Sequence, residues 1–189
     1  GSRQTGPLGV STSCRYSQCS RFSWSALPAR CEFEVGSRLV GGTCLALRYG
    51  HRTSVDLDFF SITDFTNDEL NTNLLNAGIP FKYNNLQNKI GLFGYIDNIK
   101  VDFVKHHHFK QIDKAVIIDD IRMFGDRDII AMKIFAILQR AQKKDFWDLA
   151  ELFQHYSFKQ CIEAYTEKYP ANQMLISIPY AIAYFADAE

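Results

Sequence analysis

Apolar and polar residues alternate in short runs through the first half of the chain, which is the pattern of half-buried β-strands. The clearest run covers residues 54–60 (SVDLDFF), and similar runs predict strands at residues 38–40, 81–84, 89–95 and 99–104. Asp97-Asn98 supplies turn residues for a hairpin between the last two strands. Two short helices are predicted among the strands, one over residues 44–49 and one capped by Thr66 or Asn67 and ended by Gly78.

The spacing of apolar residues changes at residues 123–125 from every second residue to every third or fourth. The recurring positions are Ile130, Ile134, Ile137, Leu138 and Ala141, and they predict a long helix from Gly125-Asp126 to about Gln142. Further helices are predicted at residues 145–155, 158–168 and 173–186. We therefore expect an α+β fold in which a small mixed β-sheet with helices on one side is followed by an α-helical bundle, with an active site in the cleft between them.

The first 31 residues differ in charge from the rest of the chain. They hold four arginines and no acidic residue, whereas the remainder holds 17 basic and 21 acidic residues. Arginine- and serine-rich sequence without acids can mark a transit peptide, but the opening Gly-Ser and Gly6-Pro7-Leu8-Gly9, which resembles a protease-cleavage remnant, favour foreign sequence. We expect a foreign or disordered leader at residues 1–36, an α+β domain at 37–122 and a helical domain at 123–189.

Composition narrows the class of protein. Hydrophobic residues make up 47% and charged residues 22%, with 21 basic and 21 acidic residues, so the chain carries no overall nucleic-acid signature. No apolar run approaches the ~18–20 residues of a membrane helix. Five cysteines without a paired C-x-x-C motif argue against a disulfide framework. These features predict a soluble cytoplasmic protein without a membrane partner.

The candidate chemistry lies in Gly41-Gly42-Thr43 and in the Asp56-x-Asp58 motif that follows it. A Gly-Gly turn at a helix N-terminus lets backbone N–H groups approach a phosphate, and Thr43 adds a hydroxyl. Carboxylates two residues apart on a strand share a face, so their charges favour a cation between them. Mg²⁺ prefers such ligands together with substrate phosphates. Asp102, among apolar residues in a predicted strand, could complete a two-metal cluster.

Other polar residues have weaker signals. Arg52 and Ser54 could contact phosphate, although Arg52 could instead pair with an acid. Lys133, Arg140 and Lys144 share a helical spacing that would form a basic stripe, although Lys133 could be an ordinary surface lysine. Asp145 and Asp148 could simply stabilise the start of their own helix. Residues 106–108 (HHH) lack the spacing of a zinc site and are predicted to be a polar connector.

Four segments in order carry a resemblance to a known family. They are residues 39–47 (LVGGTCLAL), 50–60 (GHRTSVDLDFF), 128–133 (DIIAMK) with Arg140, and 143–149 (KKDFWDL). Together they resemble the AbiEii/AbiGii toxin family of the polymerase-β-like nucleotidyltransferase superfamily, over the chain from about Arg38 onward. Family members usually have a helix before the first strand and continue beyond the position of Glu189, so the helical half is expected to be truncated here.

The resemblance assigns roles to these residues. It implies that Gly41, Gly42 and Thr43 hold the triphosphate, that Asp56, Asp58 and, by position, Asp102 bind metal, that Lys133 contacts phosphates, and that Asp145 or Asp148 is essential. With the contacts predicted above, the candidate catalytic residues are Asp56, Asp58, Asp102, Lys133, Asp145 and Asp148. The candidate nucleotide-binding residues are Gly41, Gly42, Thr43, Arg52, Ser54, Lys133 and Arg140.

The implied function is metal-dependent transfer of an NMP from an NTP to an acceptor hydroxyl, with Mg²⁺ or Mn²⁺ as cofactor and pyrophosphate released. The acceptor would be RNA, such as tRNA, or protein. The protein would be the toxin of a bacterial toxin–antitoxin or phage-defence (abortive infection) pair, with a cognate antitoxin as partner. Two alternatives stay open at this point: a catalytically silent nucleotide-binding module and an antitoxin-type interaction protein.

Overall fold

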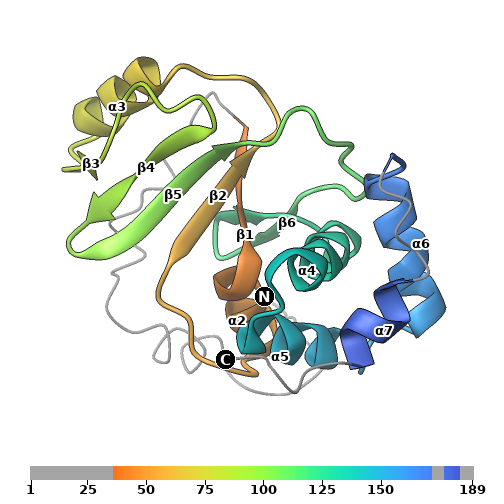
Figure 1. Cartoon of the computed structure of the whole chain (residues 1–189). Helices are drawn as coiled ribbons and strands as arrows, with labels where there is room; N and C mark the ends of the chain where they lie inside the picture. The colour runs from red at the N-terminus through yellow and green to blue at the C-terminus, as the bar shows by residue number, and fades with distance from the viewer. Residues whose placement is uncertain (1–35, 172–176, 184–189) are drawn as a thin grey trace, which may run out of the picture.

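The computed structural model describes residues 36–171 and 177–183 (Figure 1). The predicted leader lies outside these residues except for Gly36, as do the two ends of the predicted helix 173–186. The described chain forms a sheet with the strand order β3-β4-β5-β2-β1-β7-β6. The strands are β1 (Ser37–Val40), β2 (Leu57–Ser61), β3 (Lys82–Tyr83), β4 (Gly91–Ile96), β5 (Ile99–Lys105), β6 (Val116–Ile118) and β7 (Ile121–Met123).

The sheet is mixed, which confirms the predicted fold class. Strand β1 pairs antiparallel with β2 and parallel with β7, while β2 pairs parallel with β5. The predicted hairpin turn is present, with positive φ at both Asp97 and Asn98. A second hairpin, β6–β7, was not predicted from the sequence; it turns in the same way through Asp119 and Asp120.

The helices lie in two places (Figure 1). They are α2 (Gly41–Tyr49), α3 (Asn67–Asn76), α4 (Asp126–Arg140), α5 (Lys143–Leu152), α6 (Phe158–Lys168) and α7 (Ser177–Ala183). Helix α3 packs near β4 at one end of the sheet, whereas α4 packs against α5, α6 and α7 beside its other end. The α4 stripe is confirmed, since Ile130, Ile134 and Ile137 are buried in the core. No described helix has both the length and the apolar sequence needed to span a bilayer.

Two local expectations are corrected. Strand β2 begins at Leu57 rather than Ser54, so Asp56 lies in the loop just before the strand. The prediction that residues 106–108 form a polar connector is wrong for His106. This residue is 5% exposed and packs against the rings of Phe60 and Phe109. Burial and the nearby charge of Lys168 lower the pKa of His106 to about 3. His106 is therefore a neutral core residue.

Candidate active site

The turn between β1 and α2 is closed over by two charged side chains. Gly41 has φ of 70°, a conformation that favours glycine, and a Cβ built there would lie 3.0 Å from Oδ2 of Asp58. A Cβ at Gly42 would lie 1.8 Å from Nη2 of Arg52. A side chain at position 42 would therefore displace Arg52, and one at 41 would be strained and crowd Asp58. The two glycines let a carboxylate and a guanidinium approach the same stretch of backbone.

Thr43 and Ser54 fix the loop that carries Asp56. The hydroxyl of Thr43, which is 2% exposed, hydrogen-bonds with Oγ of Ser54 at 2.8 Å and donates to the carbonyl oxygen of Asp56. These bonds explain why the strand starts late, since residues 54–56 bond to α2 and not to a neighbouring strand. Both predicted nucleotide-binding hydroxyls thus have a positioning role in the structure.

The start of α2 has the character of an anion site. Its N-cap residue, Val40, makes no side-chain cap, and the first turn contains no acidic residue. The first N–H groups of a helix have no partner within the helix and attract anions. The Arg52 guanidinium beside Gly42 adds a full positive charge at the same place.

Two carboxylates meet on adjacent strands. Asp58 in β2 and Asp102 in β5 are paired in register, so their side chains leave the sheet on the same face. Burial raises the pKa of Asp58, and the carboxylates of Asp102 and Asp56 raise it further, against the opposing charges of Lys100 and Lys133. Within the described chain, the buried Oδ1 atom of Asp102 has no hydrogen-bond partner, while Oδ2 lies 2.6 Å from Nζ of Lys100.

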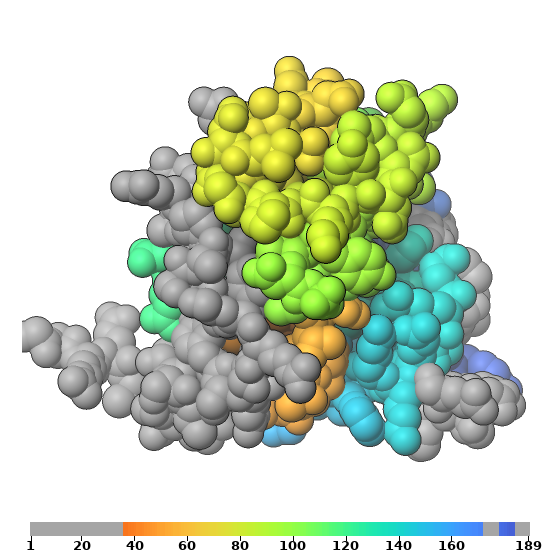
Figure 2. Space-filling view, turned by 90° about the vertical axis from the view of Figure 1, so that its left-hand side faces the viewer, coloured from red at the N-terminus to blue at the C-terminus, as the bar shows by residue number. Residues whose placement is uncertain are grey.

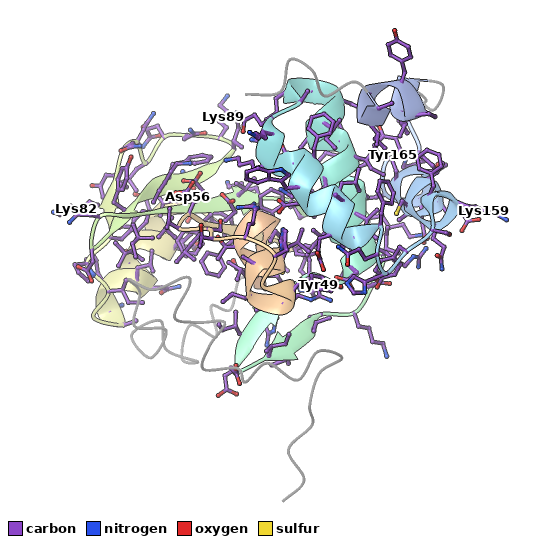
Figure 3. All side chains as sticks on the ribbon, turned by 90° about the horizontal axis from the view of Figure 1, so that it is seen from below. Tyr49, Asp56, Lys82, Lys89, Lys159 and Tyr165 are labelled. Atoms are coloured by element: carbon purple, nitrogen blue, oxygen red, sulfur yellow. The ribbon has the colours of Figure 1, made fainter. Side chains whose placement is uncertain are left out.

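This carboxylate pair fits a hard divalent cation. Like charges held together in a partly buried place favour a cation, and an unpaired buried oxygen is a free ligand atom. Among residues 36–171 and 177–183, however, no three His, Cys, Asp or Glu side chains converge closely enough to hold a metal. The structure brings Asp58 and Asp102 together and places Asp56 in the loop just before β2 (Figure 3).

A buried ion-pair network lies beside these carboxylates. Asp148, with a fully buried side chain, accepts two bonds from Arg52, at 2.6 Å and 2.9 Å, and contacts Nε2 of His51 at 2.7 Å. Nζ of Lys133 lies 2.6 Å from Asp148 and 3.0 Å from Asp145. Three elements meet here: the consecutive helices α4 and α5, and the loop after α2, which is distant from them in the sequence.

The network keeps its acids ionised. Burial raises the pKa of Asp148, but the hydrogen bonds from Arg52 and His51 and the charge of Lys133 outweigh burial, so its pKa lies well below the usual range. The pKa of Asp145 is lowered for the same reason, by Arg140 and Lys133 against burial. We therefore expect both carboxylates to stay charged at neutral pH and to hold the cations in place.

The sequence-based alternatives can now be decided. Lys133 is not a surface lysine, because its side chain is only 7% exposed. Arg52 does pair with an acid, Asp148, while also lying against Gly42. Asp145 and Asp148 do more than stabilise the start of α5, since both lie in the buried network. The prediction that Lys144 belongs to the basic stripe is wrong. Lys144 is exposed and lies beyond Ala141, the C-cap residue of α4.

Two residues of the site were not predicted. Lys100 lies two positions before Asp102 on β5, and this spacing on a strand could have suggested that they share a face. His51 had no such signal, because its partner Asp148 is 97 residues away. On one face of the molecule, the segment before β2 lies between the β4–β5 hairpin and the helical half (Figure 2). The candidate residues thus lie where the two halves of the molecule meet.

Comparisons with known proteins identify the family of this chain. The family model described as nucleotidyl transferase AbiEii toxin, type IV TA system, matches residues 27–182. The chain is 33% identical to the uncharacterized protein aq_aa25 of Aquifex aeolicus (strain VF5) over 153 residues, covering 79% of this chain and 74% of that protein.

One of two similar solved structures supports the fold. The antibiotic-resistance factor ANT(2'')-Ia is similar with a TM-score of 0.55 at 13% identity, over 82% of this chain and 91% of that chain. JHP933 from Helicobacter pylori has a TM-score of 0.46 at 18% identity, over 87% and 91% of the two chains. The family match spans both halves of the site, from the glycine turn to α5. The chain therefore belongs to the nucleotidyl transferase AbiEii toxin family and is a nucleotidyltransferase.

Proposed function

We propose that this nucleotidyltransferase moves an NMP from an NTP to an acceptor hydroxyl in a reaction that depends on Mg²⁺ or Mn²⁺. One observation carries the proposal: the glycine turn at the start of α2 lies directly against Asp58, which is itself paired with Asp102. A phosphate-binding backbone and a metal-binding carboxylate pair are thereby adjacent. This adjacency is what transfer of a phosphorus-containing group requires.

In this mechanism the protein holds the triphosphate and orients the attack. Backbone N–H groups of Gly42 and Thr43 bind phosphate oxygens, and Arg52 and Lys133 neutralise the negative charge that the pyrophosphate carries away. The acceptor oxygen bonds to the α-phosphorus as the bond to the bridging oxygen of the β-phosphate breaks; pyrophosphate leaves, and the proton of the acceptor hydroxyl passes to water. Asp56, Asp58 and Asp102 are the residues that would hold a divalent cation, which would supply Lewis-acid stabilisation of the charge.

The acidic network acts as a positioning device. Asp148 contacts Arg52, His51 and Lys133, and Asp145 contacts Lys133 and Arg140. Three of these cations, Arg52, Lys133 and Arg140, contact only two carboxylates. This network therefore has an excess of positive charge, which is available for phosphates. Part of this positive charge is accessible from solvent, because the side chain of Arg140 is 50% exposed.

The family supports a proposal for the biological role. Its description names a toxin of a type IV toxin–antitoxin system, which supports a toxin role and a cognate antitoxin as partner. We propose that the protein acts in the cytoplasm, where NTPs are made. RNA, such as tRNA, and protein are the acceptors we propose to test first. A role in abortive infection would be one use of such a pair.

The decisive experiment is label transfer. The protein is incubated with each α-labelled NTP, with Mg²⁺ or Mn²⁺, and with total RNA or lysate, and the labelled band is identified while pyrophosphate release is measured. Asp58→Asn serves as the inactive control. Label on a macromolecule with matching pyrophosphate supports the proposal. A rise in melting temperature with NTP but no pyrophosphate would indicate a silent nucleotide-binding module, and no response to any NTP would indicate an interaction protein.

A further inference from the structure

Lys100 directly contacts one member of the carboxylate pair, Asp102. Its Nζ lies 2.6 Å from Oδ2 of Asp102, and both residues leave β5 on the same face. The side chain of Lys100 is 48% exposed, whereas that of Asp102 is 11% exposed. Oδ1 of Asp102 is buried and Lys100 contacts Oδ2, so a cation bound to either oxygen of this carboxylate lies beside the ammonium group of Lys100.

Lys100 interacts electrostatically with more than one acidic residue. The hydrogen bond to Asp102 raises the pKa of Lys100 despite some burial, and the charges of Asp102, Asp58 and Asp56 raise it further. These are the three residues predicted to bind metal. A single ammonium group therefore offsets part of the repulsion among all three carboxylates.

We propose that Lys100 is a built-in counter-ion of the metal site, which a divalent cation must displace from Asp102 in order to bind. The inference rests on the proposed function, because it takes the carboxylates as the metal ligands. A site with this counter-ion favours a metal ion that arrives together with an NTP over a bare metal ion. Bare metal has to displace Lys100 without compensation, whereas metal arriving with an NTP brings phosphates to which the displaced ammonium can bind. Lys100 thus couples metal binding to nucleotide binding.

Metal binding without nucleotide tests this directly. Free Mn²⁺ is measured by electron paramagnetic resonance during titration of wild type, Lys100→Met and Lys100→Arg. Removing the ammonium, with its charged hydrogen bond, should tighten binding of bare Mn²⁺ about ten-fold in Lys100→Met. Lys100→Arg keeps the charge and should stay within about two-fold of wild type. Lys82→Met is the matched control, since Lys82 is an exposed lysine on β3, farther from the carboxylates, and should also change little.

A second titration uses Mn²⁺ with a non-hydrolysable NTP analogue. Here the advantage of Lys100→Met should disappear or reverse, because wild type gains a contact between Lys100 and phosphate. The inference is overturned if Lys100→Met binds bare Mn²⁺ no more tightly than Lys82→Met, while Asp58→Asn abolishes binding; the metal site then stands and Lys100 is an ordinary surface ion pair. If wild type, Lys100→Met and Asp58→Asn all fail to bind Mn²⁺ both without and with the NTP analogue, both the inference and the proposed metal dependence fail.

Discussion

Two clusters of buried charge in this molecule have different properties. In the first, Asp145 and Asp148 of α5 contact cations from α4 and from the loop after α2, at the junction of the two halves. In the second, Asp128 of α4 contacts Lys168 of α6 at 2.7 Å, with both side chains fully buried. We call them the junction cluster and the α4–α6 cluster. Both contain carboxylates and amines on helices, so helical position and residue type alone do not separate them.

The α4–α6 cluster is complete in itself. Asp128 accepts hydrogen bonds from the backbone N–H groups of Ile112 and Asp113, and Nζ of Lys168 also donates to the carbonyl oxygen of Lys110. One acid balances one amine, and the backbone supplies the other bonds. Such an arrangement fixes the packing of α6 and the chain before β6 against α4, and it leaves no charge for a ligand.

The junction cluster is not balanced in this way. Arg52, Lys133 and Arg140 face two acids, and Arg52 also lies against the glycine turn. The comparison shows that burial of charge is weak evidence for a functional site, because structural ion pairs are buried too. Excess positive charge beside a helix N-terminus without a side-chain cap is the more specific signal.

The largest expected effect is loss of activity in Asp58→Asn. The change removes the central carboxylate of the metal site, so NMP transfer should fall by about 10³-fold or more, and stabilisation by Mg–NTP should vanish. The fold should be unharmed or slightly more stable, because the pKa of Asp58 is already raised by burial and by neighbouring carboxylates. Label transfer and thermal unfolding with and without Mg–NTP measure both effects. Equal Mg–NTP shifts in mutant and wild type would refute the assignment.

The next effect concerns the α4–α6 cluster. Lys168→Met leaves Asp128 buried without its counter-charge and should lower the free energy of unfolding by ~3–5 kcal/mol. The matched control is Lys159→Met in the same helix, where an 85% exposed lysine faces Glu163 at 3.9 Å; its effect should be under ~1 kcal/mol. Figure 3 shows Lys159 at the outer edge of the molecule. Urea unfolding gives both values, and comparable small losses would show that the α4–α6 pair is not structural.

Features of this molecule that depend on residues close together in the sequence were predicted better than those that depend on residues far apart. Period-two alternation and the Asp97-Asn98 turn predicted most of the sheet, because these signals are local. The β6–β7 hairpin was missed, although Asp119-Asp120 between apolar residues is a similar signal; its strands have only three residues each. Asp58 and Asp102 were predicted from motifs, but their pairing depends on the parallel register of β2 and β5, which no local pattern encodes.

The partners of the buried charges were the hardest part to predict. Lys133 and Lys168 both occur in helical sequence, and the predicted basic stripe together with the family resemblance distinguished Lys133. The contact of Lys168 with Asp128 spans 40 residues, and that of Arg52 with Asp148 spans 96. Such contacts arise from the packing of whole helices. Sequence patterns therefore predicted which residue types matter better than which of them meet.

A third prediction tests whether the junction cluster acts on nucleotide. If Lys133 binds the triphosphate, Lys133→Ala should weaken NTP binding by ten- to a hundred-fold, equivalent to ~1.5–3 kcal/mol for a charged hydrogen bond. Calorimetric titration below the melting temperature measures the change. Arg48→Ala is the control, since Arg48 pairs with Asp126 at 2.7 Å on the far end of α2 and should do much less. Equal small losses would place Lys133 in a purely structural role.

The smallest expected effect is a pH dependence of the free energy of unfolding, caused by His106 on the α4–α6 side of the molecule. Burial, together with the charge of Lys168, lowers the pKa of His106 from an ordinary value of about 6.5 to about 3. Between these values the unfolded chain binds a proton that the folded protein does not, so stability falls as the pH falls. Integrating from pH 7 to pH 5 gives a loss of about 2 kcal/mol from this one group.

His106→Phe provides the test, because phenylalanine keeps a ring among Phe60, Phe109 and Phe124 but cannot take up a proton. The free energy of unfolding of this variant should depend less steeply on pH between 7 and 5, by the ~2 kcal/mol assigned to His106. Asp58 acts with the opposite sign, since its raised pKa favours the folded state on acidification, so the proteins with and without His106→Phe are compared in the Asp58→Asn background. Asp145 and Asp148 do not offset the change, because their lowered pKa values keep them ionised in this range. Identical pH slopes with and without the His106→Phe substitution would mean that His106 takes up its proton without unfolding the core.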